Sequence, residues 1–196
     1  MDRLPLDAFP EVIPPEVATF LEDAERRIED FNERHGEEIV PGFIASNPYY
    51  AYAALQQLTA QHPAGGRTFC EWGSGFGVIA CLARLLGFRA SGIEIEPLLI
   101  AEARKLAADH HLDIRFYEGS YKPEGFYTDE IDPARLSQPL GVSPLEFDLI
   151  YVYPWPAEYD RVMDMLHRFA APGTEVLLFR GGGKLEYWRQ PDADAA

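Results

Sequence analysis

Three glycines that follow an acid within a few residues are the part of this sequence that most clearly indicates chemistry. Gly73, Gly75 and Gly77 alternate with other residues just after Glu71. Glycines at this spacing let the backbone turn sharply and let a ligand lie against bare peptide groups. At the start of a helix, such a turn also offers backbone N–H groups to an anion. We therefore expect a small-molecule site here that includes Ser74.

The spacing of the glycines and the preceding acid limit the classes of ligand that this turn can bind. Turns that bind dinucleotides favour Gly-x-Gly-x-x-Gly, which leaves room for a pyrophosphate. Here the third glycine, Gly77, comes one residue early. Glu71 adds a negative charge, which suits a ligand that carries an ammonium group. An NAD-linked oxidoreductase remains an alternative, although the chain has no Tyr-x-x-x-Lys pair.

A second acid, Glu94, is expected at the end of the next strand, about 20 residues after the first glycine. An acid at this place can accept hydrogen bonds from both hydroxyl groups of a ribose. Ile95 follows it directly and would line the same site. The alternative is that Glu94 only complements the dipole of the helix that follows.

Two more strand ends carry side chains that could contact a ligand. After the strand predicted at 113–117, Ser120 could bond an adenine amino group beside an aromatic ring, or the segment is a plain turn. After the strand predicted at 147–153, Tyr153 and Trp155 are each followed by proline, in a rigid turn that cannot continue the sheet. A cationic group would be attracted to these ring faces, unless Trp155 only packs under the next helix.

Strands and helices alternate along the part of the chain that contains these residues. The strands are expected at 68–72, 90–95, 113–117, 147–153 and 174–179, and the helices between them at 75–86, 97–110 and 157–170. This alternation predicts a doubly wound, mostly parallel α/β sheet over residues 65–196. Residues 1–64 are expected to form a helical extension that caps the site on its substrate side, with an irregular lead-in over 1–15 and helices at 16–35 and about 46–61. The long segment 119–146 is either a lid or a plain connection.

Residues 68–179 resemble the class I methyltransferases that depend on S-adenosylmethionine (SAM). Residues 71–77 match the first motif of that superfamily, and Glu94 matches its ribose-binding acid. Ser120 stands where many members carry an adenine-binding acid. The Tyr-Pro-Trp-Pro turn at 153–156 is similar to the Asp/Asn-Pro-Pro-aromatic motif of amino-directed methyltransferases, but it lacks the leading Asp or Asn. The first two motifs also resemble those of some protein-lysine methyltransferases.

The resemblance implies a Rossmann-like fold, SAM as cofactor, and methyl transfer to an acceptor that the sequence does not identify. Residues 71–77 would hold the methionine part of SAM. Four residues would border the methyl group or assist its transfer: Tyr49, Tyr153, Trp155 and, as a base suggested by position alone, Glu118. Tyr50 is the alternative to Tyr49. A domain that binds SAM without catalysis remains the alternative function.

The composition and charge of the chain limit the classes of partner that we expect it to bind. The 196 residues carry a formal net charge of −15, which disfavours nucleic acid as a partner and suits an amine acceptor, or only keeps the protein soluble. We expect no membrane span, because no apolar run reaches about 18 residues, and a cytoplasmic protein, because the start lacks the layout of a signal peptide. Cys70 and Cys81 indicate neither a disulfide framework nor a zinc site.

The end of the chain departs from the family pattern. Members usually continue after the fifth parallel strand with a helix and an antiparallel pair of strands, whereas here only residues 181–196 remain. Residues 185–189 could supply one strand. An exposed sheet edge is a hazard for unwanted pairing, so we expect the N-terminal helices or a second subunit of a homodimer to cover it.

Overall fold

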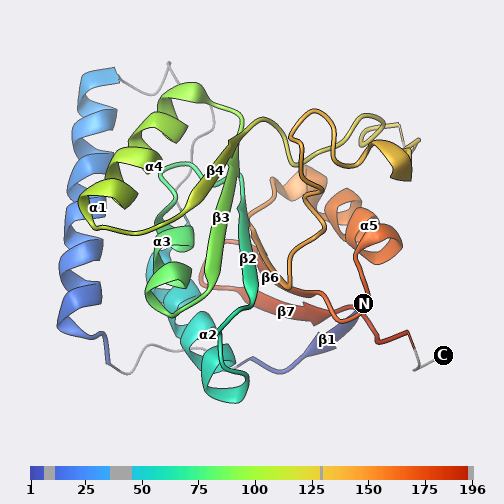
Figure 1. Ribbon diagram of the computed structural model, residues 1–196, viewed down its shortest axis with the longest axis horizontal. Helices are drawn as coiled ribbons and strands as arrows, with labels where there is room; N and C mark the ends of the chain where they lie inside the picture. The colour runs from blue at the N-terminus through green and yellow to red at the C-terminus, as the bar shows by residue number, and fades with distance from the viewer. Residues whose placement is uncertain (7–11, 36–45, 129, 194–196) are drawn as a thin grey trace.

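The computed structural model describes residues 1–6, 12–35, 46–128 and 130–193, and its centre is a seven-stranded sheet in the order β1-β7-β6-β5-β2-β3-β4 (Figure 1). Five strands run parallel: β2 (Thr68–Trp72), β3 (Arg89–Glu94), β4 (Arg115–Glu118), β5 (Leu149–Val152) and β6 (Glu175–Phe179). β7 (Leu185–Arg189) is antiparallel to β6, and β1 (Asp2–Leu4) is antiparallel to β7. The predicted parallel strands are all present.

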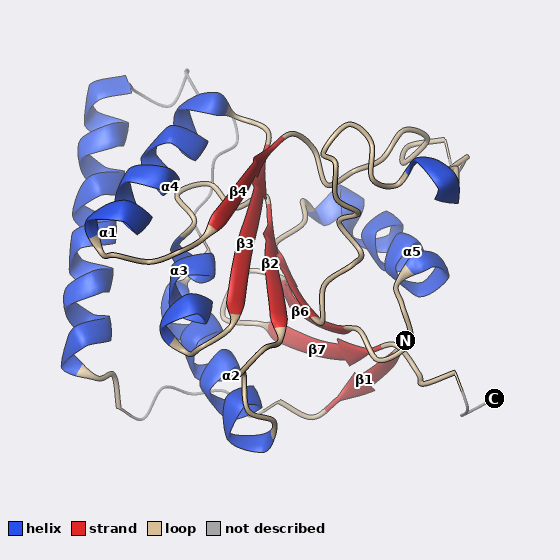
Figure 2. Cartoon of the chain, viewed as in Figure 1, coloured by secondary structure: helices blue, strands red, loops and turns tan. Residues whose placement is uncertain are grey.

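Helices cover both faces of the sheet, as predicted for a doubly wound fold (Figure 2). One face carries α1 (Pro15–His35), α2 (Pro48–Gln61), α3 (Val78–Leu85) and α4 (Pro97–Asp109). The other carries α5 (Tyr159–Phe169) and the segment between β4 and β5, which includes a 3₁₀ turn at Pro133–Arg135. A second 3₁₀ turn, Pro156–Glu158, precedes α5. Each face therefore has its own apolar core.

The edge of the sheet differs from the expectation for residues 1–15. Residues 2–4 are not an irregular lead-in but form β1, in which Arg3 is paired with Trp188 of β7. The strand predicted at 185–189 is present and receives its partner from the start of the chain. The expected cover by helices or by a second subunit is therefore not needed along β7, because a strand of the same chain already pairs with it.

A proline in β1 is expected to destabilise the protein. Arg3→Pro removes a backbone N–H from the shortest strand, and we expect a loss of about 1–3 kcal/mol of unfolding free energy. Urea unfolding would measure it. Arg3→Ala is the matched control, since it removes the side chain, which lies 3.6 Å from Glu186, but keeps the N–H. Equal urea midpoints for the two variants would show that the pairing of β1 contributes little.

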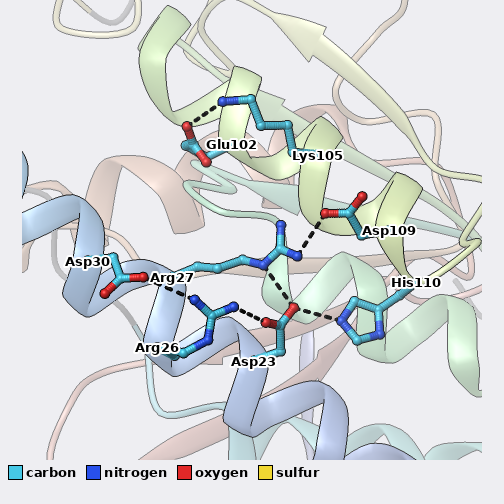
Figure 3. Close-up of polar contacts among 8 residues, drawn as sticks. All are labelled: Asp23, Arg26, Arg27, Asp30, Glu102, Lys105, Asp109 and His110. Atoms are coloured by element: carbon cyan, nitrogen blue, oxygen red, sulfur yellow. Dashed lines mark hydrogen bonds and ion pairs between the residues drawn. The ribbon is translucent and has the colours of Figure 1, made fainter.

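A polar network attaches α1 to the end of α4 (Figure 3). The Arg27 guanidinium donates to Asp109 and to Asp23, each at 2.8 Å, and the His110 ring nitrogen lies 3.0 Å from Asp23. Burial would raise the pKa of Asp23, but the hydrogen bonds from His110 and Arg26 outweigh it and lower that pKa. The network holds α1 against the helical layer, with another face of α1 directed to the carboxyl ends of the strands.

The segment between β4 and β5 is packed rather than extended into solvent. Phe126 and Leu145 are buried in the core of the α5 face, and the Trp72 indole N–H donates to the carbonyl of Pro144 at 3.1 Å. Lys122 pairs with Glu158 at 2.7 Å. These contacts hold the end of the segment beside the carboxyl end of β2 and its start beside the 3₁₀ turn that precedes α5.

Candidate functional site

A cavity of about 730 Å³ lies at the carboxyl ends of β2, β3 and β5. Its walls come from α1, the start of α2, the glycine turn after β2, the start of α4 and the turn at 153–156. Cavities of this size at the carboxyl ends of parallel strands commonly hold small molecules. The predicted site residues that line it are Tyr49, Glu71, Gly73, Ser74, Glu94, Ile95, Tyr153 and Trp155.

Glu71 is a buried acid of β2, and its side chain reaches the first turn of α3. Its carboxylate accepts a hydrogen bond from the backbone N–H of Ala80 at 2.9 Å. Burial raises the pKa of Glu71 to about 8, against the effect of that hydrogen bond and with a further increase from the charge of Glu94. The prediction that backbone N–H groups at this helix start are free to bind an anion is therefore wrong for the N–H of Ala80. That group already donates to the carboxylate of Glu71.

Glu94 is buried at the end of β3, and its carboxylate points into the glycine turn. One oxygen accepts from the N–H of Gly75 at 2.7 Å, and the other accepts from those of Ile95 and Glu96, each at 2.8 Å. A carboxylate has about four acceptor positions, so three backbone bonds leave about one for a ligand. Glu94 is thus held in place and is still able to accept a hydrogen bond from the cavity.

The glycines of the turn have different structural roles. Gly73, with φ of +68°, lines the cavity, and a Cβ on it would meet only the Tyr121 ring, at 3.9 Å. Gly77, also at φ +68°, lies outside the cavity lining, and a Cβ there would come within 2.5 Å of the Phe116 ring. Gly75, at φ +51°, supplies the N–H that Glu94 accepts. Gly77 therefore allows α3 and β4 to pack closely, whereas Gly73 leaves open space for a ligand.

The structure does not bring Ser120 and Glu118 into the cavity. Glu118 is exposed at the end of β4, the strand at the sheet edge, and Ser120 accepts from the N–H of Lys122 at 3.0 Å within a turn. Tyr121 and Lys122 are the residues of this segment that line the cavity. Tyr121 is the aromatic one of the two. Its ring stacks on Trp72, with centroids 4.9 Å apart and planes 15° apart.

Aromatic side chains from the start of α2 and from the turn after β5 form another part of the cavity wall. Tyr49 and Trp155 line the cavity with 43% and 48% of their surface exposed. Tyr153 also lines it and is held edge-on to Phe179, with centroids 4.9 Å apart. Tyr50 does not line it but lies against Gly183. Of the two tyrosines considered at the start of α2, Tyr49 is the one at the cavity.

The N-terminal extension is expected on the substrate side, but no individual residue of α1 is among the predicted site residues. Leu21, Ala24 and Ile28 line the cavity together with Glu25 and Glu29. The sequence shows the apolar stripe of this helix, but it does not show which face of α1 lies over the strand ends, because that depends on packing between distant segments. The described residues contain no cluster of three or more side chains that could hold a metal ion, and none of their helices has the length and apolar character of a membrane span.

Solved structures share this fold. An RNA methyltransferase from Salinibacter ruber, in complex with S-adenosyl-L-homocysteine, is 22% identical, with 76% of this chain and 94% of that one covered and a TM-score of 0.51. A precorrin-6Y C5,15-methyltransferase from Geobacter metallireducens is 14% identical over 71% of this chain and 65% of that one, with a TM-score of 0.48. No protein-family model and no curated protein matches the sequence. The chain therefore has the Rossmann-like fold of the class I methyltransferases, as predicted.

Proposed function

We propose that the protein is a SAM-dependent methyltransferase. The observation that carries the proposal is the meeting of the glycine turn, two buried acids and exposed aromatic rings around one cavity at the strand ends. The fold supports it, because it is the fold of known methyltransferases. Fold alone does not define a reaction, so the proposal depends on how these side chains suit the cofactor.

The residues present suit SAM in size, charge and hydrogen bonding. The Ser74 hydroxyl, which borders the cavity, is buried and has no hydrogen-bond partner in the described structure. A buried hydroxyl without a hydrogen-bond partner lowers stability unless a ligand or a water molecule supplies that partner. We assign Glu71 to the ammonium group of SAM, because a cation would favour the ionised form of an acid whose pKa is raised. Glu94 would accept from the ribose with its remaining acceptor position.

The chemistry of the transfer requires mainly alignment. SAM, when bound, supplies an electrophilic methyl group on a sulfonium centre. Tyr153 and Trp155 would present ring faces to that positive charge, and Tyr49 would close the cavity from α2. The walls would exclude water and hold the acceptor in line with the methyl group. We propose no role in proton transfer for Glu118, because it lies outside the cavity.

The N-terminal residues complete the site. We propose that residues 1–64 act as the acceptor side of the enzyme and residues 65–196 as the cofactor side, since residues of α1 and Tyr49 line the same cavity as the glycine turn. RNA is a second candidate acceptor, since the Salinibacter ruber protein is an RNA methyltransferase. The similarity of that protein to this chain is limited to the fold. The acidic side chains that line the cavity disfavour a phosphate backbone.

Calorimetry with SAM and S-adenosylhomocysteine tests the proposal. We expect both to bind, and a ligand at 100 times its Kd to raise the unfolding free energy by about 2.7 kcal/mol. NAD is the control and should cause no thermal shift. The absence of binding heat at millimolar S-adenosylhomocysteine would contradict the proposal. Binding without turnover on pools of amines, peptides and RNA would favour the alternative of a non-catalytic SAM-binding protein.

A further inference from the structure

We infer that the methyl acceptor is a small organic cation and that Glu25 and Glu29 of α1 bind its positive charge. The inference rests on the proposed function, since it assigns an acceptor to the same cavity. It concerns the outer wall of the cavity, formed by α1, and not the glycine turn that we assign to the cofactor.

The charges that line the cavity are strongly unbalanced. Five acidic side chains line it, those of Glu25, Glu29, Glu71, Glu94 and Glu96, of which Glu71 holds its proton up to about pH 8 because burial raises its pKa. The one basic side chain among the described lining residues is Lys122. The Lys122 ammonium is already paired with Glu158 at 2.7 Å. Walls of one sign of charge concentrate ions of the other sign, so this cavity attracts cations and repels phosphate groups.

The three inner carboxylates have partners within the chain. Glu71 and Glu94 accept from backbone N–H groups of the glycine turn and of the two following helices, as described above. Glu96 accepts from the N–H of Leu98 at 3.3 Å, at the first turn of α4. Glu71 and Glu94 are thus engaged by the backbone and, in the proposed function, by the cofactor, and Glu96 caps the first turn of α4. They leave the binding of an acceptor to the outer pair.

Glu25 and Glu29 are different, because neither has a hydrogen bond or ion pair among the residues that the structure describes. They are exposed and lie one turn apart, so they share one face of α1. The three arginines of this helix are used elsewhere. Arg26 pairs with Asp30 at 3.0 Å and also with Asp23, Arg27 pairs with Asp109, and Arg34 donates to the backbone carbonyl of Asp30 at 3.0 Å. Two negative charges therefore stand uncompensated at the mouth of the cavity (Figure 3 shows where the arginines are bound).

Exposed aromatic rings line the same cavity. Tyr49 and Trp155 are among the large apolar side chains with the most exposed surface in the described chain, and both line the cavity with the two glutamates. Rings and carboxylates together are the usual means of binding an organic cation, since the ring faces attract positive charge. A phosphate or a carboxylate ligand would gain nothing from either group.

A buried hydroxyl on the cavity lining gives independent evidence for a polar ligand. The Tyr151 side chain is 99% buried, lines the cavity and makes no hydrogen bond of ordinary geometry, although Ser46 lies near it. A buried hydroxyl without a partner is rare in folded proteins. Burial raises the pKa of Tyr151 well above its usual range, so this hydroxyl stays a donor, suited to a neutral nitrogen or an oxygen of a ligand.

The volume and the chemistry set the class of acceptor. A cavity of about 730 Å³ can take a cofactor and a small acceptor, but not a folded macromolecule. The nitrogen that is methylated must be neutral. Its lone pair forms the new N–C bond as the S–C bond breaks, the sulfonium becomes a thioether, and the product ammonium releases a proton to water. A second, protonated nitrogen would remain at Glu25 and Glu29, as in a diamine or polyamine.

Binding of amines to the protein saturated with S-adenosylhomocysteine tests the inference. The probes are putrescine, spermidine and lysinamide, with catechol as a neutral control and a short RNA oligonucleotide as an anionic one. The test variant is Glu25→Gln/Glu29→Gln. The matched control is Glu22→Gln/Glu33→Gln, which removes the same charge from exposed positions of α1 outside the cavity lining.

We expect at least one amine to bind, and the test variant to bind it at least tenfold more weakly than the control variant. In turnover assays KM should rise with little change in kcat, and added salt should weaken binding. S-adenosylhomocysteine affinity should be equal in all three proteins. Amine binding that is equal in both variants, or binding of catechol or RNA instead of the amines, would overturn the inference while the proposed function stands. Failure of S-adenosylhomocysteine to bind would remove both.

Discussion

A protein with Glu71→Gln is expected to be more stable than the parent above pH 8 and to bind SAM at least tenfold more weakly. The stability change follows from the raised pKa of this buried acid. Folded Glu71 holds its proton up to about pH 8, whereas in the unfolded chain it ionises near pH 4.5. Between these values the folded state binds more protons, so stability falls as the pH rises, by at most about 1.4 kcal/mol per pH unit.

Glutamine removes this pH dependence, since it is neutral at every pH and can still accept the hydrogen bond from Ala80. Urea unfolding at pH 6.0, 7.0 and 8.5 would measure the difference in unfolding free energy, which should increasingly favour the variant as the pH rises. Glu118→Gln is the control, because Glu118 is exposed and outside the cavity. A parallel pH dependence for parent and variant would show that Glu71 is ionised in the folded protein at neutral pH.

Glu71→Gln is thus expected to increase stability but to weaken SAM binding. The two measurements therefore separate the role of Glu71 in binding from its effect on folding. An ammonium group beside Glu71 would favour the ionised form, so SAM binding near pH 7 should release a proton and become tighter as the pH approaches 8. Calorimetry in two buffers with different ionisation enthalpies would count that proton. Unchanged SAM affinity in the variant, together with no proton release by the parent, would remove Glu71 from the site.

A Gly77→Ala substitution is expected to cost about 2–5 kcal/mol of unfolding free energy, through strain and overpacking. The backbone at Gly77 has φ of +68°, and the added Cβ would lie 2.5 Å from the Phe116 ring and 3.3 Å from Ala103. Differential scanning calorimetry should show a melting temperature lower by about 10 °C.

The matched control is Gly182→Ala, which has φ of +58° but no atom within 4 Å of the added Cβ. It carries the backbone cost alone, so the difference between the two variants reports the clash. Phe116→Leu should recover part of the loss in the Gly77→Ala protein. Equal losses for the two glycine variants would show that Phe116 moves aside freely, and that close packing is not the reason for glycine at 77.

The sequence predicted the parts of the fold and the site that depend on neighbouring residues. Apolar runs and helix starts such as Asn47-Pro48 are local signals, and the strands and helices between residues 46 and 193 follow them closely. Glu71 and Glu94 reach the cavity because each lies at or just before the end of a parallel strand. Their positions follow from the strand assignments alone.

The predictions that were wrong or incomplete concern residues whose positions depend on contacts between segments far apart in the sequence. β1 has only three residues and no alternating pattern, so its pairing with β7 leaves no trace in residues 2–4. Ser120 was placed from the family resemblance and Glu118 from its position alone, but β4 is at the sheet edge and neither side chain lines the cavity. Glu25 and Glu29 were missed because the rotation of α1 over the sheet is set by contacts with α3 and α4.

The pairing of β1 with β7 also has a consequence for the order in which the chain is made. Residues 2–4 are synthesised long before their partners at 187–189, and contacts between such distant segments form slowly. On the ribosome, the parallel strands and their helices can assemble while β1 still has nothing to bind. The pairing of β1 with β7 must therefore wait until residues 187–189 have left the ribosome, and until then β1 has no partner strand.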